Sequence, residues 1–294
     1  MQERATVYVL QRHLESTAAK LRRDFLIPHS ETAKIPQLQR IHHAIGTVRG
    51  KHITLKEAKE ITQNPQMLAD LAFLQPILDQ FAKLPSDPDL PLVNGETQKG
   101  EQIGIGLKHH LETSGRRIDV AETSPFTRAY LTAESVLSTA DQFHDNPTRR
   151  VPLQINPLLR ERLNGREVEK VADRAIYLAK HPEELVKWAR NPDTYRFPGK
   201  NVETANEAKK RVKKTVNRMK RASKDEGKVI YLSTHSEMIG EVLSQLRAKP
   251  RNIDTGTITI IEATHRTWGQ IILRRSRNLK VSETTDFTPR NPKA

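Results

Sequence analysis

Short apolar runs rich in β-branched residues alternate with helical segments along much of the sequence. An apolar run of about four to eight residues, bounded by polar or turn residues, is typical of a buried strand. Strands are expected at 5–10, 118–123, 151–155 and 228–234. Helices are expected at 100–112, 126–140 and 237–247. Strands that alternate with helices through short connections favour an α/β fold with a mostly parallel sheet.

Two further strands near the C-terminus are expected to pair differently. TGTITIIEA (255–263) and GQIILRRS (269–276) are β-rich runs separated by a short polar segment, which favours an antiparallel pair. The sequence therefore predicts a three-layer α/β sandwich. Its central sheet would be mostly parallel with an antiparallel edge, and helices would cover both faces.

The region after the first strand does not follow this alternation and is helical in pieces. Thr54 and Glu57 have the spacing of a capping box, and Asn64-Pro65 is a signal for the start of a helix. One face of the helix that follows carries apolar residues at steps of four and three: Met67, Leu71, Leu74, Leu78 and Phe81.

This pattern suggests a division of the chain. Residues 1–16 and 91–275 are expected to form the α/β core, and residues 17–90 a helical cap inserted into it. Residues 276–294 lack periodicity, so we expect a flexible C-terminal tail.

The chain is strongly basic. Its 294 residues include 49 Lys and Arg against 35 Asp and Glu, for a formal net charge of +14, which favours anionic partners. It contains no cysteine, which excludes disulfides, iron–sulfur clusters, thiolate zinc sites and cysteine nucleophiles. The sequence shows neither a membrane-spanning apolar run nor a signal-peptide pattern, so a cytoplasmic protein is expected.

Polar residues follow three of the predicted strands. Arg12 and His13 come at the end of the first strand, and Ser124 and Arg128 come after the second. His235 follows the strand at 228–234. The carboxyl ends of parallel strands meet at one edge of a sheet, so these residues are expected to converge. Histidines and arginines gathered there could handle a phosphate group.

At these positions the sequence resembles the histidine phosphatase superfamily, which includes cofactor-dependent phosphoglycerate mutases and many phosphatases. VLQRHLES (9–16) is similar to the family motif R-H-G-E-[ST], and TSPFTRAYLTAE (123–134) is similar to S-S-P-x-x-R-A-x-x-T-A. LLRERLNG (158–165) resembles L-x-E-R-x-x-G, and STHSEMI (233–239) resembles the second-histidine motif. The motifs occur in the order that the family has.

The resemblance implies a site of five residues. His13 would attack phosphorus and become a phosphohistidine, and Glu161 would protonate the leaving oxygen. Arg12, Arg128 and His235 would bind the phosphoryl oxygens, and His235 also counts among the catalytic residues. A neutral imidazole is a good nucleophile near pH 7, and arginine can stabilise phosphate charge, so the mechanism needs no metal or cofactor.

Leu14 is the main departure from the family pattern, because the family has glycine after the nucleophile. Glycine lets the backbone N–H come close to the phosphate, whereas a leucine side chain must point elsewhere or crowd the site. The insertion at 17–90 is also longer than in compact members of the family. It stands where the family commonly builds a cap over the pocket.

Three functions fit these observations. The favoured hypothesis is a metal-independent phosphatase that hydrolyses a small phosphomonoester through a phosphohistidine. The alternative is a phosphoglycerate mutase-like phosphotransferase, and a non-catalytic binder of RNA or of a phosphorylated partner is less favoured. The run KKRVKKTVNRMKR (209–221) predicts a basic helix, which is more often a solvated face than a contact for nucleic acid or acidic lipid. The sequence predicts no oligomeric state.

Overall fold

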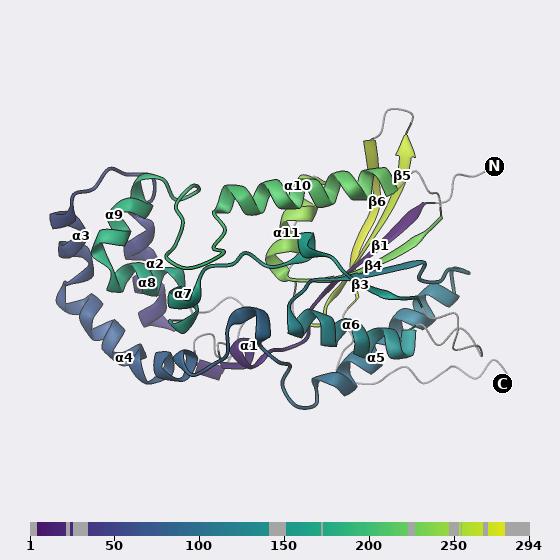
Figure 1. The fold of residues 1–294 in the computed structure, drawn as a ribbon, viewed down its shortest axis with the longest axis horizontal. Coiled ribbons are helices and arrows are strands. Elements are labelled where there is room, and N and C mark those ends of the chain that lie inside the picture. The colour runs from purple at the N-terminus through teal and green to yellow at the C-terminus, as the bar shows by residue number, and fades with distance from the viewer. Residues whose placement is uncertain are drawn as a thin grey trace. The chain divides into compact units, whose positions relative to one another are not determined.

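A computed structural model describes residues 5–21, 24–25, 35–140, 151–171, 173–222, 227–246, 253, 255–266 and 270–279 (Figure 1). Its strands are β1 (Thr6–Arg12), β2 (Val120–Thr123), β3 (Leu153–Ile155), β4 (Val229–Thr234), β5 (Ile258–Arg266) and β6 (Gln270–Leu279). They form one six-stranded sheet in the order β3-β2-β4-β1-β5-β6. The first four strands in this order are parallel, and β5 and β6 are antiparallel to their neighbours. The sequence-based strand assignments and the antiparallel edge are confirmed.

The described α-helices are α1 (Thr17–Leu21), α2 (Pro36–Gly46), α3 (Leu55–Thr62), α4 (Pro65–Ala82), α5 (Glu96–Glu112), α6 (Thr127–Ala140), α7 (Arg166–Lys170), α8 (Arg174–Lys180), α9 (Pro182–Arg190), α10 (Ala205–Ala222) and α11 (Ser236–Gln245). Two short 3-10 turns are η2 (Asp87–Asp89) and η4 (Pro157–Leu159). No described helix is long and apolar enough to cross a membrane.

Strand β1 explains why the sheet has helices on both faces. Six of its seven residues are buried, and successive side chains point to opposite faces. Val7 and Val9 pack in one cluster with residues of α5 and α6. Tyr8 and Leu10 pack in another with residues of α10 and α11. A strand buried on both faces needs a helical layer on each side, so the chain forms the expected three-layer sandwich.

The chain separates into two compact units. One comprises residues 1–15, 92–161 and 211–294 and contains the sheet; the other comprises residues 16–91 and 162–210. The sequence analysis assigned residues 162–210 to the core, whereas the structure groups them with 16–91. The reason is burial, because apolar side chains of α8 and α9 share one hydrophobic cluster with those of α2 and α4.

Helix α4 in this second unit has the predicted face. Its five predicted apolar residues are all buried, and the helix continues through Pro76. Asn64 caps its N-terminus by accepting a hydrogen bond from the Met67 N–H at 2.8 Å. The capping box of Thr54 and Glu57 is present at the start of α3.

The predicted C-terminal tail, residues 276–294, begins too early, because its first residues belong to the sheet. Strand β6 extends to Leu279, so residues 276–279 pair with β5. The remainder of that predicted tail, residues 280–294, lies outside the described residues.

Candidate active site

The carboxyl ends of β1, β2 and β4 bring the predicted site together. Arg12 pairs with Thr234 across the β1–β4 ladder, and Thr123 pairs with Ser233 across the β2–β4 ladder. The residues that follow these strands therefore leave the sheet side by side. Arg128 comes from the first turn of α6, and His235 directly precedes α11. Both helix N-termini add partial positive charge, which favours an anion.

His13 is buried and its ring has a defined tautomer. Its Nδ1 lies 2.6 Å from the carbonyl oxygen of Leu14. A carbonyl oxygen can only accept, so Nδ1 carries the proton and Nε2 keeps its lone pair. The Nε–H of Arg128 donates to this Nε2 at 3.3 Å. The ring nitrogen with the free lone pair thus faces the cation of the site.

Arg128 is the centre of the cluster. Its side chain is only 3% exposed, and its Nη2 donates to Oε2 of Glu161 at 2.5 Å. The same Nη2 lies 3.5 Å from Nδ1 of His235. One guanidinium therefore contacts His13, Glu161 and His235.

His235 is fully buried and held from several directions. Its Nδ1 lies 3.4 Å from Oε2 of Glu161, and its Nε2 lies 2.9 Å from the hydroxyl of Ser124. The ring of Phe126 meets it edge-on, with centroids 5.0 Å apart. The rings of His13 and His235 have centroids 5.1 Å apart.

The cluster shifts the pKa values of its members. Burial lowers the pKa of His13 well below its ordinary value, and the charges of Arg128 and His235 lower it further, so the imidazole is neutral at pH 7. Burial by itself would raise the pKa of Glu161. The hydrogen bond with His235 and the charges of His235 and Arg128 outweigh that effect and lower it well below its ordinary value. The carboxyl of Glu161 is therefore ionised at pH 7 in this arrangement, whereas the role implied by the resemblance requires it to donate a proton.

Arg12 lies next to this cluster with a different partner. It ends β1, and its positive charge also lowers the pKa of His13. Its Nη1 donates to the carbonyl of Ile253. Four of the five predicted residues are thus in mutual contact, and Arg12 adds positive charge beside them.

Two buried side chains form hydrogen bonds with the backbone of the segment that carries Glu161. Nη1 of Arg211, on α10, donates to the carbonyls of Leu158 and Arg160 at 3.0 and 2.7 Å. The hydroxyl of Thr234 donates to the carbonyl of Leu159 at 2.6 Å. These bonds fix the backbone directly before Glu161. The sequence analysis counted Arg211 only as one cation of a basic helix.

His13, Glu161 and His235 carry atoms of the types that bind metal ions. Among the described residues, one ligand atom of each lies within 4.8 Å of the others. The guanidinium of Arg128, however, contacts all three side chains at 3.3, 2.5 and 3.5 Å. A fixed cation at this position repels a metal ion and attracts an anion, so the group fits a phosphate better than a metal.

Leu14 points away from the site and into the core. Its side chain is 0% exposed and belongs to the cluster formed with α5 and α6. A Cβ placed at Gly100 or at Gly256 would lie 3.1 Å from Leu14. These two glycines leave the space that the leucine occupies. Leu14 therefore does not crowd the phosphate position.

Thr132 is a supporting residue that the sequence analysis missed. Its hydroxyl accepts the N–H of Leu14 at 2.9 Å and donates to the carbonyl of Arg128 at 2.7 Å. It thereby links the His13 loop to the helix that carries Arg128. Its position four residues after Arg128, on the same face of α6, was the signal available in the sequence.

Replacing Leu14 by Ala is expected to destabilise the protein without removing the site. Truncating a fully buried leucine costs about 2–5 kcal/mol of unfolding free energy. Chemical denaturation measures this loss, and Leu68→Ala on the exposed face of α4 is the control, because Leu68 is 51% exposed. A Leu14→Ala variant as stable as the control would contradict the core packing of Leu14.

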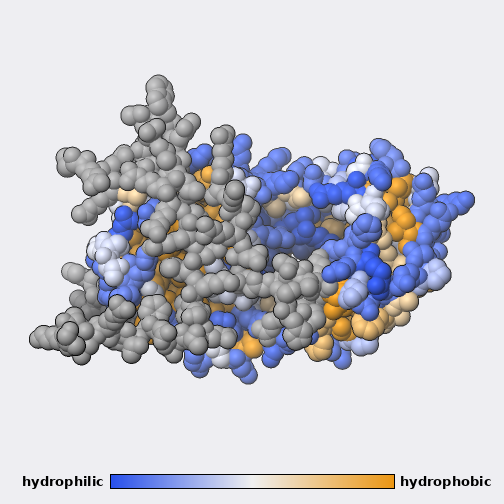
Figure 2. Space-filling view, turned by 180° about the vertical axis from the view of Figure 1, so that it is seen from behind, coloured by the Kyte–Doolittle hydropathy of each residue, from blue (hydrophilic) through white to orange (hydrophobic). Residues whose placement is uncertain are grey.

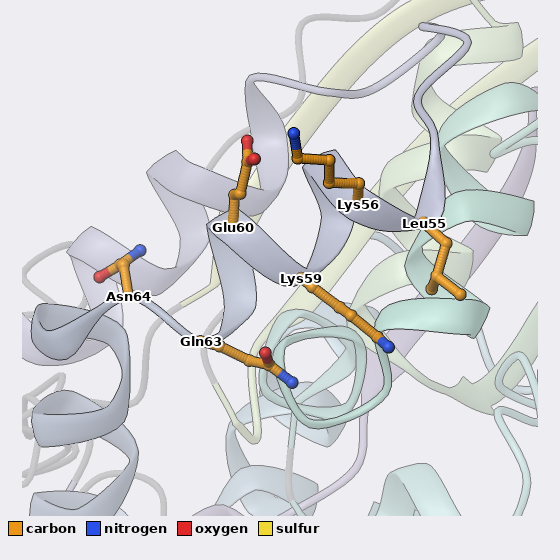
Figure 3. A pocket seen from close by; sticks show the side chains of 6 residues that line it. All are labelled: Leu55, Lys56, Lys59, Glu60, Gln63 and Asn64. Carbon is orange, nitrogen blue, oxygen red and sulfur yellow. The ribbon is translucent and has the colours of Figure 1, made fainter.

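A separate shallow hollow lies along α3 and the start of α4. Its lining consists of Leu55, Lys56, Lys59, Glu60, Gln63 and Asn64 (Figure 3). The labelled side chains include two lysines and no histidine. The hollow therefore has none of the groups that the predicted chemistry uses.

Comparisons with known proteins agree with this geometry. The family model of the histidine phosphatase superfamily (branch 1) matches residues 89–274. A structure from Escherichia coli K-12, whose proposed activity is alpha-ribazole-5′-P phosphatase, aligns with a TM-score of 0.51 and 17% identity, over 92% of this chain and 95% of that chain. A phosphoglycerate mutase from Bacillus anthracis aligns with a TM-score of 0.50 and 15% identity, over 92% of each chain.

A third structure, mycobacterial hydrolase 2, aligns with a TM-score of 0.50 and 13% identity, over 94% of this chain and 89% of that chain. At such identities these neighbours establish the fold alone. A search of curated proteins finds no match. The family match covers more than half of the chain. This chain therefore belongs to the histidine phosphatase superfamily.

Proposed function

We propose that the protein is a metal-independent phosphatase that hydrolyses a small phosphomonoester through a phosphohistidine at His13. The observation that carries this proposal is the contact of Arg128 with His13, Glu161 and His235 in a buried cluster. A neutral imidazole with a free Nε2 beside a fixed guanidinium supplies a nucleophile and a binding group for phosphoryl oxygens.

In the first step, Nε2 of His13 attacks phosphorus and forms a nitrogen–phosphorus bond, while the bond from phosphorus to the leaving oxygen breaks. Glu161 donates a proton to that oxygen, and the alcohol leaves. In the second step, water attacks the phosphohistidine and the nitrogen–phosphorus bond breaks. Glu161 takes the proton from the water, so inorganic phosphate leaves and neutral His13 returns. Arg12, Arg128 and His235 stabilise the phosphoryl oxygens in both steps.

Substrate binding favours the protonated form of Glu161, which takes its proton from solvent. In the ligand-free site, the charges of His235 and Arg128 help to keep the pKa of this carboxyl low. A bound phosphate competes for these partners and adds negative charge next to Glu161. Both changes raise the pKa of Glu161 in the complex. The acid form therefore develops when a phosphate occupies the site.

The second unit serves, in this proposal, as a cap that sets substrate choice without supplying chemistry. It carries none of the five site residues. Two arginines of this unit that could have attracted an anionic substrate form ion pairs with carboxylates of the same unit. Nη2 of Arg40 binds Asp70 at 2.6 Å, and Nη2 of Arg49 lies 3.4 Å from Asp193. Substrate choice then rests on the shape and the remaining polar groups of this unit.

The lowered pKa of His13 predicts how the site titrates. The imidazole of His13 is expected to stay neutral as the pH falls through about 6.5, because protonation starts only near its lowered pKa. Proton-detected NMR of the histidine ring carbons measures this midpoint in the ligand-free protein, and a His13→Gln variant assigns the signal. A midpoint at or above about 6.5 would contradict the electrostatics of the cluster.

A phosphatase screen tests the proposed function directly. The protein is incubated with a panel of sugar phosphates, nucleotides and inositol phosphates in the presence of EDTA. Release of inorganic phosphate and an acid-labile, alkali-stable phosphoprotein are the expected results. Complete loss of activity in EDTA would move the protein to a metal-dependent class. Transfer of phosphate to an added alcohol in preference to water would favour the phosphotransferase.

A further inference from the structure

The outer face of α10 carries several positively charged side chains that form no ion pair with the rest of the described structure. Some of the cations on this helix have partners. Arg211 binds the carbonyls of Leu158 and Arg160, and the exposed Arg218 pairs with the buried Glu122. Lys220 also has an interaction partner. The other exposed cations are Lys209, Lys210, Lys213, Lys214 and Arg221. In the described part of the chain, none of these five lies within ion-pair distance of a carboxylate.

These five cations, here called the α10 basic face, form one stripe. They recur at steps of about four residues, with the exposed Asn217 between Lys213 and Arg221. Like charges four residues apart on a helix repel one another, as Lys209 and Lys213 do. The stripe runs about 18 Å along the helix axis. A linear polyanion bound along it would relieve that repulsion.

We propose that the α10 basic face binds the phosphate backbone of nucleic acid. A length of about 18 Å corresponds to about five phosphates of one strand, which matches the number of cations in the α10 basic face. The whole chain carries a net charge of +14, so long-range attraction acts in the same direction. The contact is made to phosphates, so it is independent of base sequence. This activity is separate from the proposed phosphatase chemistry.

The composition of the helix favours nucleic acid over a membrane surface. A helix that lies in a membrane interface buries an apolar face among the lipids. The apolar residues of α10, Val212, Val216 and Met219, are instead buried in the core of the sheet unit. The outer face has only charged and polar side chains for a partner. Figure 2 shows the side of the molecule opposite to the view of Figure 1, where the coloured surface is mostly hydrophilic with smaller hydrophobic patches.

The test compares two variants of equal charge. In the first, Lys209, Lys213, Lys214 and Arg221 are replaced by Gln, which keeps helix propensity. In the control, four exposed lysines away from α10 are replaced by Gln: Lys51, Lys56, Lys59 and Lys83. The probe is a fluorescently labelled single-stranded RNA of mixed sequence, and binding is followed by fluorescence anisotropy at several salt concentrations.

The affinity of the wild-type protein for RNA is expected to fall about 100-fold between about 50 and about 200 mM salt. The logarithm of the association constant should fall with the logarithm of the salt concentration at a slope near −3.5. The α10 variant should bind more weakly, and its slope should flatten by about 3, whereas the control variant should stay close to wild type. Hydrolysis of p-nitrophenyl phosphate should be the same in the α10 variant as in wild type, which also shows that the variant is folded. His13→Ala should retain RNA binding.

Three results would overturn the proposal. An equal loss of RNA affinity in both variants would mean that only net charge matters. A loss of affinity in the control alone would move the site to the region of Lys51, Lys56, Lys59 and Lys83. Binding of wild type to vesicles of phosphatidylserine and phosphatidylcholine, without binding to RNA, would identify a lipid partner instead.

Discussion

Replacing His13 by Ala is expected to abolish phosphoenzyme formation and to lower turnover by about 10⁴-fold or more, the size of effect seen when a nucleophile is removed. The reason is that the variant lacks Nε2 of His13, the nitrogen that forms the bond to phosphorus in the proposed mechanism. Rapid-quench experiments with a radiolabelled substrate measure the phosphoprotein, and steady-state assays measure turnover.

The fold should survive this substitution. His13 lies at the end of β1, where its Nδ1 binds only the carbonyl of its neighbour Leu14. Arg128 keeps its contact with Glu161 in the variant. Circular dichroism melts check this, and His43→Ala, at an exposed position on α2, is the matched control. A folded His13→Ala protein with most of its activity would rule out the covalent mechanism.

Part of the site could be predicted from the sequence because Arg12, His13 and His235 lie at strand ends, whereas Glu161 was predicted only from the family motif. Strand β1 is apolar up to Leu10, and parallel pairing with β4 then fixes where His13 and His235 emerge. Parallel strands align their carboxyl ends whatever the intervening loops contain. The positions of the strand ends thus predicted that His13 and His235 lie close together, although they are 222 positions apart in the sequence.

The division of the chain could not be predicted in this way. Helix α9 has one buried face, which carries Leu185 and Ala189, as a helix that covers a sheet would have, and α8 is buried along five consecutive residues. They contact α2 and α3 and share a hydrophobic cluster with α4, and all three of these helices lie far earlier in the chain. Periodicity tells which face of a helix is buried but not which partner buries it. Only tertiary packing decides that residues 162–210 join residues 16–91.

The supporting residues of the site were missed for a related reason. Arg211 stood in a run of cations, and nothing local distinguishes it from the exposed lysines beside it. Its burial and its two carbonyl partners arise from the packing of α10 against the sheet. Similarly, the sequence left open whether Leu14 points elsewhere or crowds the site, because the space left by Gly100 and Gly256 is visible only in three dimensions.

Replacing Glu161 by Gln is expected to slow phosphoryl transfer from alkyl phosphates by about 10²–10⁴-fold, the usual contribution of general acid catalysis. Gln keeps the size and the hydrogen bond of Glu161 to Arg128 but cannot deliver a proton. Phosphoryl transfer from p-nitrophenyl phosphate should slow far less, because the nitrophenolate leaves readily without a proton.

The measurement must isolate the first chemical step. Hydrolysis of the phosphohistidine is common to all substrates and also uses Glu161, so steady-state turnover would fall equally for every substrate once that step limits the rate. Single-turnover rapid quench avoids this, because it follows the formation of the phosphoprotein alone. Glu134→Gln, at an exposed position on the same helix as Arg128, is the matched control. If phosphorylation by alkyl and nitrophenyl substrates slowed equally, Glu161 would only shape the pocket and hold Arg128, and the acid would have to be sought elsewhere.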